Sequence, residues 1–125
     1  MKEALGYLRN AKEILKSVPV ENNIYTDLKP VREAFSIAYL AVLEAINEHL
    51  ITHKGFTKKG LPKSVDASRN ALKKHFAVLD GKLMREFESL YKILHVADYY
   101  RKLLDRVDIV KDALKAARDF IEKIK

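Results

Sequence analysis

Residues 30–51 read PVREAFSIAYLAVLEAINEHLI. Apolar side chains recur in this stretch at steps of three and four residues, which is the spacing of one helical face. The face consists of Val31, Ala34, Phe35, Ala38, Val42, Ala45 and Ile46, and it is widened by Tyr39, Leu43 and Leu50. So broad an apolar face predicts the most buried helix of the protein. Pro30 suits its first turn, because the N–H that proline lacks would be unpaired there anyway.

The rest of the chain predicts further helices on either side. Apolar residues at helical spacing indicate helices over about residues 2–17, 65–79, 82–99 and 107–125. Pro19 ends the first of these, Asn22-Asn23 marks a turn in the following loop, and Ser64 is a suitable N-cap for 65–79. The sequence contains no strand of useful length. We therefore expect a single domain, residues 1–125, folded as an all-α antiparallel up-and-down bundle of four to five helices.

The surplus positive charge of the chain is confined to its middle. The formal net charge is +7, and residues 52–85 hold nine basic side chains against two acidic ones. The other 91 residues carry 15 charges of each sign. Such clustering predicts a surface for an anionic partner, because the field depends on local charge density. The lysines expected to bind the anion are Lys54, Lys58, Lys59, Lys63, Lys73 and Lys74.

Composition excludes several kinds of site. The chain has no cysteine, so it has no disulfide, no thiolate zinc site and no cysteine nucleophile. No apolar run approaches the ~20 residues that span a bilayer, and the start lacks the apolar core of a signal peptide. We expect a cytoplasmic protein without membrane contact, cofactor or metal. His49 and His53 share a helix face, but no third ligand is near them, and we expect His49 at the edge of the core.

The basic segment also holds the strongest candidate for catalysis. In residues 65–79 the apolar stripe is formed by Val65, Leu72, Phe76 and Leu79, and Arg69 occupies a position of this stripe. A charge at such a position must pair, reach solvent or meet a ligand. His75 lies about 120° around an ideal helix from Arg69, so one helix does not bring the two together.

The pattern Arg69-Asn70, four further residues and then His75 resembles the R-x(4–6)-H motif of the HEPN superfamily. The resemblance implies a small helical bundle, often dimeric and often encoded with a nucleotidyltransferase-type partner protein. In the ribonuclease members, Arg and His of two protomers meet across the dimer. Arg69 would then bind the phosphate, His75 would act as general acid and base, and Asn70 would support them.

A second resemblance covers the whole chain. Three patterns are similar to those of a small bacterial family of unknown function with a HEPN-like bundle: Tyr25-x-Asp27-x-Lys29-x-Val31, Ala38-Tyr39-x-x-Val42-Leu43 and Leu94-His95-x-x-x-Tyr99-Tyr100. The Leu-His…Tyr-Tyr stretch is part of that family's signature, whereas the Arg69 and His75 pair is not. This resemblance therefore implies the fold without implying nuclease activity.

A polar cluster is expected at the end of the predicted helix 82–99. Tyr91, His95 and Tyr99 follow one another at single turns, and Asp98 falls on the apolar stripe. Together they form either a ligand pocket or a polar network that fixes the helix end. Asp98 could accept a hydrogen bond from Arg69, which would explain both polar residues on apolar stripes.

Three functions are consistent with these patterns. The first is a non-catalytic binding module, a homodimer whose basic segment contacts nucleotide, RNA or an acidic protein. The second is a metal-independent HEPN-type ribonuclease toxin that uses Arg69 and His75. The third is a structural or oligomer-forming protein whose lysines confer only solubility. Salt-dependent binding to RNA separates the first two from the third.

Overall fold

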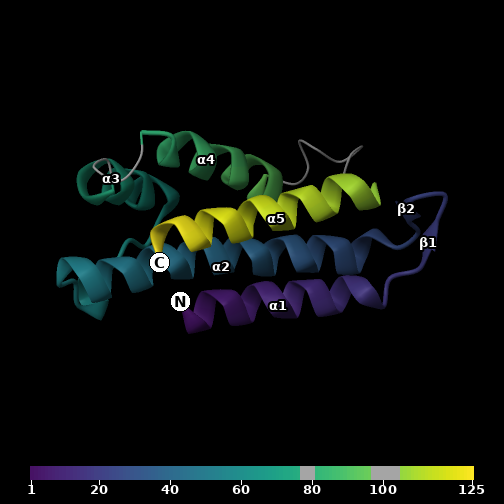
Figure 1. The fold of residues 1–125 in the computed structure, drawn as a ribbon, viewed down its shortest axis with the longest axis horizontal. Coiled ribbons are helices and arrows are strands. Elements are labelled where there is room, and N and C mark those ends of the chain that lie inside the picture. Colours follow the sequence, from purple (N-terminus) through teal and green to yellow (C-terminus); the bar gives the residue numbers. More distant parts are fainter. Residues whose placement is uncertain (77–80, 97–104) are drawn as a thin grey trace.

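The computed structural model describes residues 1–76, 81–96 and 105–125 and confirms an all-α bundle (Figure 1). Three long helices lie side by side: α1 (Lys2–Lys16), α2 (Leu28–Lys54) and α5 (Val107–Ile124). Helix α2 packs against both of the others, runs antiparallel to α1 and runs in the same direction as α5, and α1 and α5 also contact each other. Both ends of the chain lie near the end of α2. The amino group of Met1 lies 3.5 Å from Glu48, and the carbonyl oxygen of Ile124 lies 2.6 Å from His49.

Two shorter helices cover one side of this layer. Helix α4 (Leu83–Leu90) runs antiparallel to α5, and α3 (Val65–His75) lies at the end of the molecule where α2 ends. A single π-helical turn, η2 (Tyr91–His95), follows α4 directly. The helix predicted over 82–99 therefore ends at His95, since the backbone of Val96 has left the helical region. The part of the helix predicted over 65–79 that lies beyond Phe76 falls outside the described residues.

Helix α2 is longer than predicted at both ends. The carboxylate of Asp27 accepts a hydrogen bond from the Lys29 amide and caps the N-terminus. Pro30 is then the third helical residue. It still lies in the first turn, where backbone N–H groups have no partner within the helix, so its missing N–H costs no hydrogen bond. Gly55 ends the helix in the left-handed conformation, with φ of 72°.

A small hairpin replaces the predicted loop between α1 and α2. Its strands are β1 (Val20–Glu21) and β2 (Ile24–Tyr25), and the predicted turn residues Asn22 and Asn23 have φ of 53° and 63°. Positive φ at both central residues is the turn that suits the twist of a hairpin. The Tyr25 amide also donates to Asp105, and the Val107 amide donates to Asn23, so the hairpin is attached to the start of α5.

The core is centred on α2. Eleven of its residues are buried, and the largest fully buried side chains of the protein include Phe35, Phe76, Phe87 and Phe120. By length and composition α2 could cross a bilayer, but 56% of its most apolar window is buried inside the protein. A helix packed against α1 on one side and α5 on the other needs this breadth of apolar surface.

Candidate anion-binding cleft

A shallow cleft of about 490 Å³ lies between the loop that follows α2 and the helix α3. The apolar part of its lining is formed by Phe56, Leu61, Pro62, Ala67 and Ala71. Three predicted anion ligands line it as well, namely Lys59, Lys63 and Lys74, together with Asn70 and His75. The cleft thus combines an apolar surface, three cations and two side chains that can both donate and accept hydrogen bonds.

The loop that forms one wall is fixed at both ends. The Phe56 amide donates to Leu50 and closes the C-terminus of α2. A single 3₁₀ turn, η1 (Lys58–Gly60), then carries Lys58 and Lys59. The hydroxyl of Ser64 accepts from the Ala67 amide at 3.0 Å and starts α3, as predicted. Local backbone bonds therefore position these lysines relative to α3.

The six lysines predicted to bind an anion are all exposed. Within the described residues none of them makes an ion pair with an acidic side chain. The nearest acid in sequence, Asp66, is held by Arg69 at 2.8 Å. The positive field of these lysines is therefore left uncompensated by the part of the chain that the structure describes.

His75 and Asn70 both reach the cleft. The ring of His75 meets Phe56 edge to face, with centroids 5.0 Å apart and planes at 89°. Asn70 is exposed and lies one helical turn before Lys74 on the same side of α3. The structure thus brings these two residues together with Lys59, Lys63 and Lys74.

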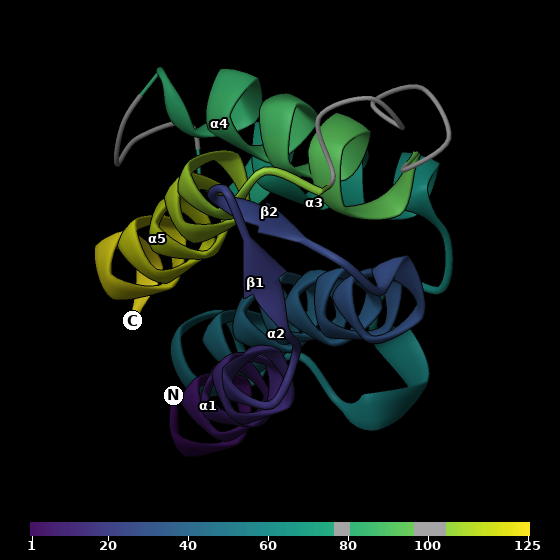
Figure 2. The ribbon, with the colours of Figure 1, turned by 90° about the vertical axis from the view of Figure 1, so that its right-hand side faces the viewer.

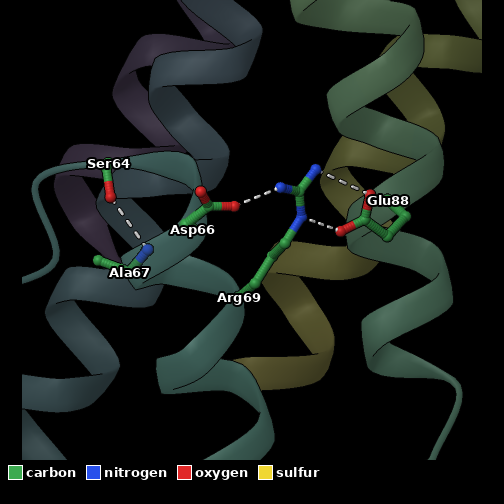
Figure 3. A network of polar contacts seen from close by, with 5 residues as sticks. All are labelled: Ser64, Asp66, Ala67, Arg69 and Glu88. Carbon is green, nitrogen blue, oxygen red and sulfur yellow. Dashed lines mark hydrogen bonds and ion pairs between the residues drawn. The ribbon is translucent and has the colours of Figure 1, made fainter.

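Arg69 is not among the residues that line this cleft. Figure 3 shows its contacts with Asp66 and Glu88. Its guanidinium forms a two-pronged contact with the Glu88 carboxylate, and its third nitrogen donates to Asp66 at 2.8 Å. It also lies over the Tyr91 ring, 5.0 Å from the centroid. The hydrogen bonds that Arg69 donates to Glu88 and Asp66 raise the pKa of Arg69, which keeps it charged.

The predicted catalytic set is thus divided within one chain. Asn70 and His75 lie in the cleft, whereas Arg69 joins α3 to α4 on another side of the helix. Of the three outcomes expected for the Arg69 charge, the structure shows pairing, with Glu88 and Asp66 as the partners. The proposed partner Asp98 lies outside the described residues. Catalysis by Arg69, Asn70 and His75 stays a hypothesis.

Tyr91 and His95 belong to an aromatic cluster that continues from the Arg69 contact. Their rings lie 5.4 Å apart, and Tyr39 of α2 stacks on His95 at 4.6 Å. Burial, more than the neighbouring charges, raises the pKa of Tyr39. Tyr39 is a member that sequence reasoning missed, because its position on the apolar face of α2 indicated only the core. Tyr99, the fourth predicted member, lies outside the described residues.

Comparison with known proteins places the chain among helical proteins of unknown function. All of residues 1–125 match the family described as "Domain of unknown function (DUF5618)". The chain belongs to this family. A solved structure of a protein of unknown function from Dyadobacter fermentans is 32% identical to this DUF5618 chain, with a TM-score of 0.76. The match covers 98% of this chain and 90% of that one. No curated protein matches.

The family assignment confirms the resemblance to a helical family of unknown function, and the solved neighbour supports the bundle of this DUF5618 chain. Neither comparison names the HEPN superfamily.

Of the two histidines on α2 of this DUF5618 chain, His49 is part of the core. His49 is 7% exposed, and its Nδ1 lies 2.6 Å from the carbonyl oxygen of Ile124, to which it donates. Its ring packs on Phe76 and lies 4.8 Å from that of His53. Burial lowers the pKa of His49, so the neutral form is favoured. In the described ranges no group of three or more potential ligands could hold a metal ion.

Proposed function

We propose that this protein is a non-catalytic binding module for single-stranded RNA, with the cleft between residues 56–63 and α3 as its binding site. The observation that carries the proposal is the group of exposed lysines around this cleft, none of which has an acidic partner among the described residues. Such lysines attract phosphates, and their contacts release the counterions of a nucleic acid.

The aromatic rings in the lining of the cleft favour RNA over an acidic protein. Half-buried Phe56 and His75 offer aromatic rings beside the three lysines, and bases stack on such rings. The amide of Asn70 can both donate to and accept from a base edge. A single-stranded nucleic acid presents bases and phosphates together, so it uses all of these groups.

The finer predictions stay proposals beside this one. Membership of the HEPN superfamily and a homodimer are suggested by the resemblance of the sequence alone. A ribonuclease would need Arg69 at the phosphate, and in this chain its donors are engaged by Glu88 and Asp66. We therefore expect RNA to be bound without being cleaved.

The test is fluorescence anisotropy with a labelled single-stranded RNA of about 12 nucleotides, within the usual site size of one small domain, at ~50 mM salt. The cleft variant carries Lys59→Glu, Lys63→Glu and Lys74→Glu. A control variant carries the same charge change on exposed cations of α1 and α5, namely Lys12→Glu, Lys111→Glu and Arg118→Glu. We expect the cleft variant to bind about tenfold more weakly or worse, and the control variant to bind nearly as well as the wild type.

Equal losses in the two variants would contradict the site, because net charge alone would then explain binding. Tighter binding of polyglutamate than of RNA would assign the cleft to an acidic protein. Gel analysis of the RNA tests the ribonuclease alternative. Cleavage that is lost in His75→Ala while binding is retained would establish that alternative in place of our proposal.

A further inference from the structure

A second basic surface lies far from the middle of the sequence. It is a groove of about 760 Å³ between α1, α5 and the hairpin. Figure 2 views this end of the molecule, with the hairpin in front of the helices. The proposed RNA site shares no residue with this groove.

The floor of the groove is apolar. Leu15 comes from the last turn of α1, Val18 from the residues just after α1, and Leu114 from the middle of α5. Val107 is half-buried and Val20 is 53% exposed, so apolar surface remains open to solvent at the hairpin end. Covering this surface would favour association.

The walls of the groove are basic on both sides. Cations from both helices line it: Lys12 and Lys16 of α1, and Lys111, Lys115 and Arg118 of α5. The acid that lines it is Asp119, which lies 3.9 Å from Lys115. Lys16 pairs with Glu13 and Arg118 interacts electrostatically with Glu122, whereas no acidic partner of Lys12 or Lys111 occurs within the ranges described. These cations are available to a ligand.

Tyr25 adds a polar group to the floor. Its side chain is 5% exposed and lines the groove, and burial raises its pKa, so the hydroxyl stays protonated. Nothing in the described part of the chain forms a hydrogen bond with that hydroxyl. No buried side-chain polar atom in the described part of the chain lacks a hydrogen-bond partner, so this hydroxyl reaches the surface of the groove, where it can donate to a ligand.

We infer that this groove binds an acidic amphipathic helix of a partner protein. Along α5 the lining residues recur at helical spacing from Val107 to Arg118, a length of about 16 Å, or three turns. An apolar floor with cations on both walls over that length complements a helix whose apolar stripe is flanked by Asp and Glu. A single small anion would need only one or two of the cations. RNA would leave the apolar floor unused.

The test uses a synthetic helical peptide of about 18 residues, long enough to hold some helix in isolation. Leucines at i, i+3, i+4 and i+7 form its apolar stripe, and glutamates flank the stripe. A scrambled peptide of the same composition and a peptide with Lys in place of Glu are its controls. Anisotropy is measured with wild type, with the Lys12→Glu, Lys111→Glu, Arg118→Glu variant, with Tyr25→Phe and with the cleft variant.

We expect the acidic helical peptide to bind wild type and the cleft variant alike. Binding should be about tenfold weaker or worse in the Lys12, Lys111 and Arg118 variant, and a few-fold weaker in Tyr25→Phe. The inference is overturned if the scrambled or basic peptide binds as well, if the groove variant binds normally, or if RNA displaces the peptide. Circular dichroism of each variant establishes that the loss is not unfolding. RNA binding is expected to depend on the cleft lysines, and peptide binding on the groove cations. The two proposals can therefore fail independently of each other.

Discussion

Gly55 allows a direct test of how α2 ends and the cleft loop begins. Its φ of 72° lies in the left-handed region, and a Cβ built there meets nothing within 4 Å. Replacing Gly55 by Ala therefore adds no clash, and the whole cost is conformational. An L-residue other than Gly pays roughly 1–2 kcal/mol in this region. We expect Gly55→Ala to lower the free energy of unfolding by about 1 kcal/mol.

The same substitution at Gly6 provides a matched control. Gly6 lies inside α1 with nothing within 4 Å of a built Cβ and without a positive φ. Alanine is favoured over glycine in a helix by about 0.8–1.0 kcal/mol, so Gly6→Ala should stabilise the protein. The same change of side chain should thus alter the free energy of unfolding in opposite directions at the two positions, and the two variants should differ by about 2 kcal/mol.

Urea unfolding followed by circular dichroism measures both changes. Asn tolerates the left-handed region better than Ala, so Gly55→Asn should lose less stability than Gly55→Ala. The reasoning is refuted if Gly55→Ala is neutral or stabilising, or if Asn at this position is worse than Ala. Either result would mean that the helix does not end in a left-handed residue at Gly55.

Three further outcomes follow from the fold. Burial lowers the pKa of His49 below its ordinary 6.5. The contribution of His49 to the free energy of unfolding is therefore complete above pH 6.5 and is lost as the pH falls through the folded pKa. A pH series of urea unfolding should show this loss in the wild type and not in His49→Gln. Ser64→Ala should cost about 1 kcal/mol by removing the cap of α3, whereas Ser64→Asp should retain most of the stability. Phe87→Ala should cost about 3–5 kcal/mol, because the ring is fully buried; calorimetry showing an unchanged melting temperature would refute its place in the core.

Local chemistry made the starts and ends of several elements predictable. Ser64 caps α3, and Asn22-Asn23 forms a turn, because each depends on a few neighbouring residues. The hairpin itself was missed. Its strands have two residues each, and its further bonds reach the start of α5, about eighty positions along the chain. No local pattern carries that information.

The early end of the helix after α4 also depends on distant contacts. The spacing of Tyr91 and His95 predicted a continuous helix, yet these residues form a π-helical turn. Both rings pack around Tyr39 from α2, and a π turn shifts the backbone hydrogen bonds by one residue from the α-helical pattern. Periodicity reports which face is apolar, whereas it does not report a shift of one residue in the hydrogen-bond pattern.

The candidate site was predictable in part. Its lysines were predicted from charge clustering. The place of Arg69 on an apolar stripe predicted that its charge must pair, reach solvent or meet a ligand. Its partner Glu88 could not be predicted, because it depends on how α4 packs against α3. The groove cations Lys111 and Arg118 were hidden by the charge balance of the terminal helices, since counts of charge do not tell which face carries them.

The salt dependence of RNA binding tests the central claim most directly. Each lysine that contacts a phosphate of a single strand contributes about 0.7 to the slope of log affinity against log salt. If Lys59, Lys63 and Lys74 all make such contacts, wild type should have a slope steeper by about 2 than a variant with all three changed to Gln. Equal slopes for the two proteins would contradict the account, because the phosphates would then be bound elsewhere.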